Sequence, residues 1–175
     1  MAVEWVALAA GIAIIIAVAA VITRMKANLR RQAADLNKAC SDIEVLLKRR
    51  NDDLPRLLQI CRSYMPGEQN ALRLITESRA AFLKAKNTAQ KESLDAAVGR
   101  ALHTLFIEVS KYPELKANNM FSQLKNELLE IGEQIDDRRD LFNDDARRFN
   151  RRLERPPAAW LAARMKLKRH ELFQS

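Results

Sequence analysis

The stretch WVALAAGIAIIIAVAAVI, residues 5–22, decides how this chain is organised. It contains no charged side chain, and only Glu4 carries an ionisable side chain before it. As a helix rising about 1.5 Å per residue, it is about long enough to cross the hydrocarbon core of a bilayer. Basic residues are absent before the stretch and follow it at Arg24, Lys26, Arg30 and Arg31. This asymmetry predicts one membrane anchor, residues 1–23, with the N-terminus outside and the rest cytoplasmic.

Two other interpretations of the apolar stretch compete with an anchor. Ala17-Val18-Ala19 resembles the cleavage site of a secretory signal, but a signal peptide has a basic segment before a shorter apolar core. A buried helix of a soluble protein would need apolar neighbours on every side. The position of the positive charge after the stretch therefore favours an anchor that stays on the chain.

The rest of the chain, about 150 residues, is long enough for one domain with a real core. It contains few glycines and aromatic residues and many Ala, Leu and charged residues, which favours long helices over strands. Cys40 and Cys61 both lie on one apolar stripe. We interpret them as reduced core thiols, because a cytoplasmic domain rarely holds disulfides.

Apolar residues recur at helical spacing in four segments that breakers separate. The first segment runs from the anchor to Pro66-Gly67, and we expect a kink near Pro55. A shorter helix includes residues 72–82, a third covers about 89–111, and the last runs from about 118 to Arg155-Pro156-Pro157. The short links predict an all-α fold in which residues 24–155 form an antiparallel four-helix bundle.

Arginines interrupt the apolar stripes at Arg50, Arg79 and Arg138. Because isolated buried charges are costly, these side chains need acidic partners. We expect a polar layer that these arginines form with four acidic residues, Asp53, Glu77, Asp136 and Asp137. The alternative is that the long arginine stems run along the core and place their charges in water.

The net charge of +8 is concentrated in two segments. Residues 24–50 hold eight basic and three acidic residues, and residues 147–170 hold nine basic and one acidic residue. In an antiparallel bundle the two segments meet beside the membrane, where each Lys or Arg near anionic headgroups contributes about 1 kcal/mol. The intervening residues 51–146 carry a net charge of −3, from thirteen basic and sixteen acidic residues. A solvated charged face is the alternative interpretation.

The tail, residues 156–175, is apolar with basic residues interspersed. This pattern suits a short amphipathic helix in the plane of the headgroups, with Trp160 at the interface. A tail packed on the end of the bundle is equally compatible with it. The predicted lipid contacts are the basic residues after the anchor, Arg24, Lys26, Arg30 and Arg31, and four residues of the tail, Trp160, Arg164, Lys166 and Lys168.

No motif for catalysis, metal or cofactor binding is present in the sequence. Neither His103 nor His170 has a Glu three residues before it, as di-metal bundles require. Phosphate-binding glycine loops, nucleophile elbows and zinc-hydrolase motifs are absent as well. Acidic doublets at 52–53, 136–137 and 144–145 are typical of solvated helix faces. We therefore expect no catalytic residue, no metal, no cofactor and no enzymatic activity.

Several blocks resemble the bacterial LemA family. The most specific is Tyr112-Pro113-Glu114-Leu115-Lys116-Ala117-Asn118, which runs on to Phe121. Similar blocks lie at residues 49–57 and 76–79, at Phe142-Asn143 and at Phe149-Asn150, while Lys168 and Phe173 follow the family's closing pattern. The resemblance covers nearly the whole chain. It implies an anchored antiparallel bundle in the cell membrane or in an intracellular bacterial organelle membrane, and it supplies no catalytic residues. Gly132, where Glu is usual, and two Phe in place of Tyr depart from the pattern.

Two functions fit these observations. The first is a scaffold or adaptor that presents the mildly acidic part of the bundle, including links 66–70 and 112–120, to protein partners. The second is a structural protein that binds or shapes anionic membranes through its basic segments. Nucleic-acid binding is not expected, because the basic residues gather beside the anchor. The sequence identifies no partner and leaves a homo-oligomer open.

Overall fold

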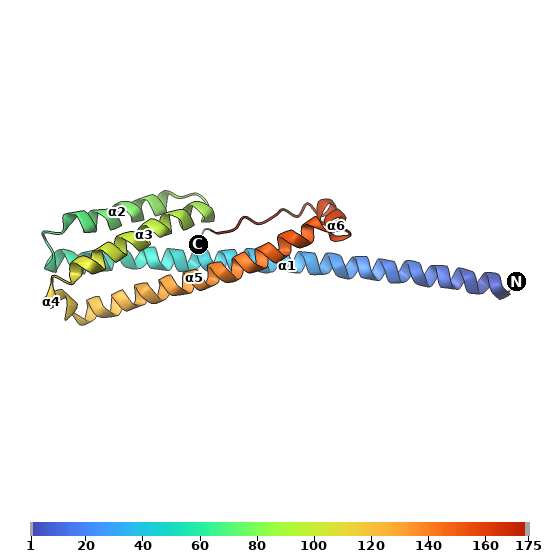
Figure 1. Cartoon of the computed structure of the whole chain (residues 1–175), viewed down its shortest axis with the longest axis horizontal. Coiled ribbons are helices and arrows are strands. Elements are labelled where there is room, and N and C mark those ends of the chain that lie inside the picture. The colour runs from blue at the N-terminus through green and yellow to red at the C-terminus, as the bar shows by residue number, and fades with distance from the viewer. Residues whose placement is uncertain (1, 174–175) are drawn as a thin grey trace. The chain divides into compact units, whose positions relative to one another are not determined.

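The computed structural model describes the backbone of residues 2–173, and the side chains of all of these except 2–4, 6–9 and 89. The described residues form helices and connecting turns, without a strand. Helix α1 (Ala2–Tyr64) is the longest, with 63 residues, and holds Pro55 in its interior (Figure 1). It includes the one described segment that is long and apolar enough to cross a membrane, and the apolar window of 18 residues is not buried. The prediction of one helix from the apolar stretch to the Pro66-Gly67 link is confirmed.

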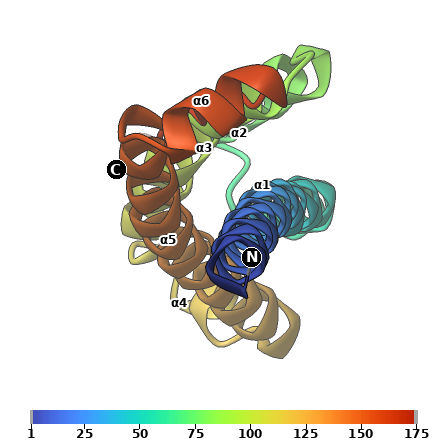
Figure 2. The same ribbon diagram turned by 90° about the vertical axis from the view of Figure 1, so that its right-hand side faces the viewer.

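Three further helices follow the first link. Helix α2 spans Gln69–Lys84, α3 spans Thr88–Val109 and the short α4 spans Pro113–Lys116. The start of α3 is fixed by Asn87, whose side-chain oxygen accepts a hydrogen bond from the Gln90 backbone N–H at 2.8 Å. Helices α2 and α3 lie side by side (Figures 1 and 2). The sequence predicted a stop at Tyr112-Pro113, whereas Pro113 begins α4, because a first-turn proline loses no helical hydrogen bond.

Helix α5 (Asn119–Glu154) has 36 residues and ends before Pro156-Pro157, as predicted. Helix α6 (Ala158–Arg164) occupies only seven residues of the tail. It ends in a Schellman motif, in which the backbone N–H of Leu167 donates to the Ala162 carbonyl at 3.0 Å. Lys166 supplies the left-handed residue of this motif, with φ of 52°. Residues 167–173 follow without regular structure.

The chain divides into two compact units. Unit 1 comprises residues 1–38 and 144–171, and unit 2 comprises residues 39–143 and 172–175. Both units contain parts of α1 and α5, so their bounds differ from those of the predicted domains, 1–23, 24–155 and 156–175. Residues 24–38 and 147–170, which include most of the two basic segments, belong to the same unit.

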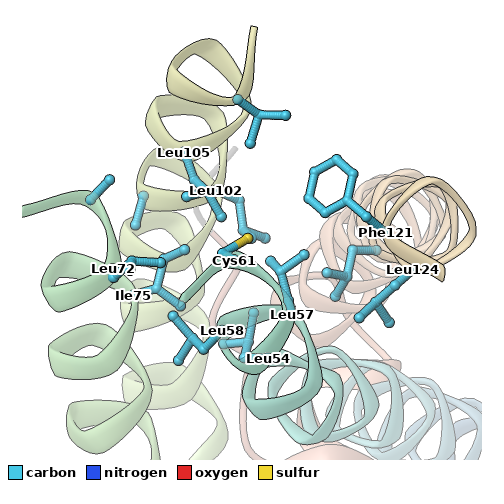
Figure 3. Close-up of a cluster of buried hydrophobic side chains, with 14 of the residues drawn as sticks. Leu54, Leu57, Leu58, Cys61, Leu72, Ile75, Leu102, Leu105, Phe121 and Leu124 are labelled. Atoms are coloured by element: carbon cyan, nitrogen blue, oxygen red, sulfur yellow. The ribbon is translucent and has the colours of Figure 1, made fainter. Parts of the chain in front are cut away.

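The core of unit 2 is a cluster of buried apolar side chains from five helices. Figure 3 shows Leu57 and Cys61 of α1 and Phe121 of α5 pointing toward side chains of α2 and α3. Burying a large apolar side chain contributes about 1.5–3 kcal/mol, so this cluster is the main source of cohesion in unit 2. Both cysteines are free, as expected, and burial raises the pKa of the Cys61 thiol to about 12.

Unit 1 has a smaller set of buried side chains. They come from α1, α5 and α6, and they are Leu29, Leu36, Ala146, Phe149 and Ala162. Leu29 and Leu36 are seven residues apart in α1, and Ala146 and Phe149 are three apart in α5, so each pair lies on one helix face. Among the described side chains of residues 10–21, none joins this core, and Ile14, Ile15 and Ile16 are each more than half exposed.

Candidate functional site

A buried cluster of charged side chains lies in unit 2. Arg50 Nη1 and Arg139 Nη2 lie 3.1 Å and 3.3 Å from the same oxygen, Oδ2 of Asp95. Arg139 Nε lies 3.5 Å from Glu92 Oε1. The Asp95 side chain is 1% exposed, and none of the four side chains exceeds 13%. Two arginines and two carboxylates thus form a buried cluster whose charges balance when both acids are ionised.

Helix geometry brings these groups together. Glu92, Asp95 and Gly99 follow one another at spacings of three and four in α3 and so share a face. Gly99 and Gly132 leave room for the Arg50 guanidinium, since an added Cβ would lie 3.6 Å and 3.5 Å from Nη2. A side chain longer than Ala at either position would therefore enter the space of the guanidinium.

Burial governs the ionisation of the two acids. Desolvation raises the pKa of Asp95 above its ordinary value, and the positive charges of Arg50 and Arg139 oppose this shift. Desolvation also raises the pKa of Glu92, with Arg139 again opposing. Three buried polar atoms of the cluster have no hydrogen-bond partner among the described residues; they are Arg50 Nε, Asp95 Oδ1 and Arg139 Nε. The ion pairs of the cluster can fix how α1, α3 and α5 pack together. The polar atoms without a partner can form hydrogen bonds with additional polar groups.

Of the residues predicted for a polar layer, Arg50 lies in the buried cluster with an acid that was not among the predicted partners. Arg50 pairs with Asp95 instead of Asp53, which is half-buried. Arg79 Nε donates to the backbone carbonyl of Asn51 at 3.2 Å instead of to an acid. Glu77 forms an exposed pair with Arg73 at 3.3 Å. The cluster therefore includes the predicted Arg50, and its two buried acids come from α3.

On α5 the buried arginine is the residue that follows the predicted Arg138. Arg138 is exposed and lies 3.7 Å from Asp42, whereas Arg139 is 11% exposed and is the buried arginine. Asp136 pairs with Arg139 from the surface at 3.0 Å, and Asp137 is exposed. Asp95 was not among the predicted residues, although it lies three residues before Val98 on the buried stripe that continues to Leu102 and Leu105.

A second candidate site lies in unit 1, near the end of α5. Arginines line a pocket of about 470 Å³ there together with two uncharged residues; the lining is Arg148, Arg151, Arg152, Arg155, Pro156 and Ala158. Trp160, two residues further, is 73% exposed. The other predicted lipid contacts are also in unit 1, and all are exposed except the half-buried Lys26; they are Arg24, Arg30, Arg31, Arg164, Lys166 and Lys168.

Two asparagines of α5 hold the segment after α6. Within unit 1, Asn150 Nδ2 donates to the His170 carbonyl at 2.8 Å and Asn150 Oδ1 accepts from the His170 N–H at 3.0 Å. Within unit 2, Asn143 makes the same pair of bonds with Phe173, at 3.0 Å and 2.8 Å. Each asparagine follows a phenylalanine whose ring contacts the same residue, Phe149 with His170 and Phe142 with Phe173. We call each Phe-Asn pair a tail clamp.

The links between helices of unit 2 form a third candidate site. The Tyr112 hydroxyl donates to Glu68 Oε1 at 3.3 Å, and Asn118 Nδ2 donates to the Tyr64 hydroxyl at 3.1 Å. Leu115 lies between Tyr112 and Asn118 in the sequence, and its side chain is fully buried in the core of unit 2. These bonds tie the link after α1 to the link that contains α4. We call residues 64–70 and 112–120 the link surface.

Taken together, these features define a class: an all-helical protein with a long N-terminal helix, whose apolar segment belongs to a strongly basic unit. The chain belongs to the LemA family, whose family model matches residues 39–175. Comparison with curated proteins gives no match.

Proposed function

We propose that this protein is a non-enzymatic, membrane-anchored scaffold or adaptor, in which α1, α2, α3 and α5 form an antiparallel four-helix bundle. Family membership supports a helical, membrane-associated protein. The exposed apolar window of α1 supports an anchor, because exposing so much apolar surface to water is unfavourable. The basic residues after the window support a cytoplasmic bundle, in the cell membrane or in an organelle membrane.

The link surface carries the proposal of partner binding. Beside it, α1 and α5 line a pocket of about 390 Å³, whose lining includes Ile60, Tyr64, Met120 and Leu124 together with polar residues. Met120 is 62% exposed. An aromatic residue and a methionine at the rim of a pocket are typical of protein interfaces, where a few such residues supply most of the binding energy. The hydrogen bonds of Tyr64 and Tyr112 preorganise this surface, which lowers the entropic cost of binding.

The experiment is crosslinking of the full chain in its native membranes, followed by identification of the crosslinked proteins. We expect Met120→Asp to remove protein partners that the wild-type chain captures. The matched control is Leu129→Asp, also on α5 and 46% exposed but outside the pocket lining. Partners that survive Met120→Asp as well as Leu129→Asp would contradict docking at the link surface. Cysteine-accessibility labelling on the two sides of the membrane tests the orientation separately.

A second function, binding or shaping of anionic membranes, is favoured by the distribution of charge. Unit 1 holds 14 Lys or Arg and 6 Asp or Glu, a difference of +8, whereas unit 2 holds 16 of each. The whole net charge therefore belongs to the unit that contains the apolar window. Vesicles with and without anionic lipid distinguish this function, since a scaffold that is merely anchored binds both equally.

A further inference from the structure

The pocket near the end of α5 concentrates positive charge. Arg148, Arg151 and Arg152 lie on the last two turns of α5, and Arg155 follows directly. Spacings of three and four residues place these side chains on one helix face, where like charges repel. The negative end of the helix dipole offsets part of this repulsion. The alternative interpretation is therefore that these arginines stabilise the end of α5 and bind no ligand.

Neighbouring acids do not neutralise the pocket. Among the described residues, no acidic oxygen lies within ion-pair distance of Arg151, Arg152 or Arg155, and Arg148 has only Asp145 at 3.9 Å. The other acids nearby form their ion pairs outside the pocket, and Asp144 adds only a longer-range attraction to Arg148 and Arg151. Asp144 pairs with Arg147 at 2.7 Å, and Glu154 pairs with Arg169 at 3.1 Å. Because these arginines lack close acidic partners, their charge is available to an anion from outside the chain.

The chemistry of the lining selects the kind of anion. Guanidinium groups form paired hydrogen bonds with phosphate oxygens, and several of them around one hollow suit a phosphate group. Pro156 and Ala158 add an apolar part to the lining, which suits the carbon atoms attached to a phosphate ester. We propose that this pocket binds the phosphate of an anionic lipid headgroup. The proposal rests on the membrane-binding function above and names its ligand.

The surroundings favour a lipid over a soluble phosphate ester. Unit 1 contains both the pocket and the apolar window of α1. Trp160 is exposed close to the pocket in sequence, and Trp is enriched at membrane interfaces. Clusters of basic residues next to a membrane-spanning helix attract anionic headgroups.

The test is calorimetric titration of the full chain in a neutral detergent with short-chain phosphatidic acid, short-chain phosphatidylcholine and inorganic phosphate. We expect saturable binding of phosphatidic acid, with phosphatidylcholine and inorganic phosphate at least about tenfold weaker. Arg151→Gln with Arg152→Gln should weaken phosphatidic acid binding at least about tenfold. The matched control, Lys48→Gln with Arg49→Gln, removes the same charge from exposed positions of unit 2 and should change affinity less than about twofold.

Three outcomes overturn the proposal. Absence of phosphatidic acid binding removes the site, and equal loss in both double variants means that net charge alone attracts the lipid. Inorganic phosphate that binds as tightly as phosphatidic acid contradicts a lipid headgroup as the ligand. Flotation with neutral vesicles in high salt tests the anchor independently, because a membrane-spanning helix holds the chain there with or without the pocket. The anchor and the pocket can thus fail separately.

Discussion

Units 1 and 2 contain similar numbers of arginines and lysines but use them in opposite ways. In unit 2 they are balanced by acids, 16 against 16, and two of the arginines are buried in pairs with Asp95. In unit 1 they outnumber the acids by 14 to 6, and most remain on the surface. Charge inside a core must be neutralised by a partner. Charge beside a membrane attracts anionic lipids only when it is not neutralised within the protein. The comparison separates a unit built for cohesion from one suited to binding an external anion.

The largest effect is expected from removing Asp95, the acid that both buried arginines of unit 2 share. We expect Asp95→Asn to lower the free energy of unfolding by about 3–5 kcal/mol, because two buried arginines lose their shared partner. Urea unfolding of the full chain in detergent, followed by circular dichroism, measures this loss. Asp137→Asn, which removes an exposed acid, should stay within about 0.5 kcal/mol of wild type. Equal stability of the two variants would show that the cluster is not needed for cohesion.

The tail clamps provide one comparable contact in each unit. Asn143→Ala removes two hydrogen bonds to Phe173, each with a net contribution of about 0.5–1.5 kcal/mol. We expect amide hydrogen exchange at Phe173 to become about tenfold to a hundredfold faster. Asn150→Ala should have the corresponding effect at His170. Unchanged exchange at Phe173 in Asn143→Ala would mean that the asparagine does not hold the segment.

A smaller effect tests the space around Arg50. Gly132→Ala should raise the free energy of unfolding by about 0.5–1 kcal/mol, because Ala favours the helix and its Cβ makes only ordinary contact with the guanidinium. The larger Gly132→Leu should lower it. Thermal unfolding of both variants beside wild type checks the sign of each change. Stabilisation by Leu would show that the guanidinium is not confined at this position.

Acidification should distinguish the clamp of unit 1 from that of unit 2. Burial lowers the pKa of His170 below its ordinary value of 6.5, so the docked segment disfavours the charged ring. The contribution of the neutral His170 ring to docking is therefore fully present above pH 6.5 and is lost as the pH falls through the lower pKa of the docked state. Nuclear magnetic resonance titration of the His170 ring measures this pKa, which Asn150→Ala should return toward 6.5. A pKa above 6.5 would contradict the burial of the ring.

The helices of this chain could be predicted closely from sequence, because the apolar stripes and the breaks at Pro66-Gly67 and Pro156-Pro157 are strong local signals. The polar layer could be predicted only in part. The stripe of α5 passes Ile135 and then allows either Arg138 or Arg139, since both a step of three and a step of four keep to one helix face. Which arginine is buried depends on where Asp95 lies across the core, and that is tertiary information.

The segment after α6 was the least predictable part. Its contacts with Asn143 and Asn150 use backbone N–H and carbonyl groups, which every residue except proline has in the same form. The side chains of residues 167–173 therefore do not indicate which residues of α5 hold the segment. The arginine-lined pocket was missed for a related reason, because a run of basic residues does not reveal which of them have acidic partners.

The tail clamps also determine which sequence changes the C-terminal segment can absorb. An asparagine amide that pairs with a residue's own N–H and carbonyl recognises the polypeptide, not the side chain. Residues between the two clamps, such as Glu171 and the half-exposed Leu172, are thus free to drift in sequence without releasing the segment. Proline at position 170 or 173 is the exception, since it has no N–H to donate. Residues 170–173 are consequently held firmly while their amino-acid sequence is only loosely constrained.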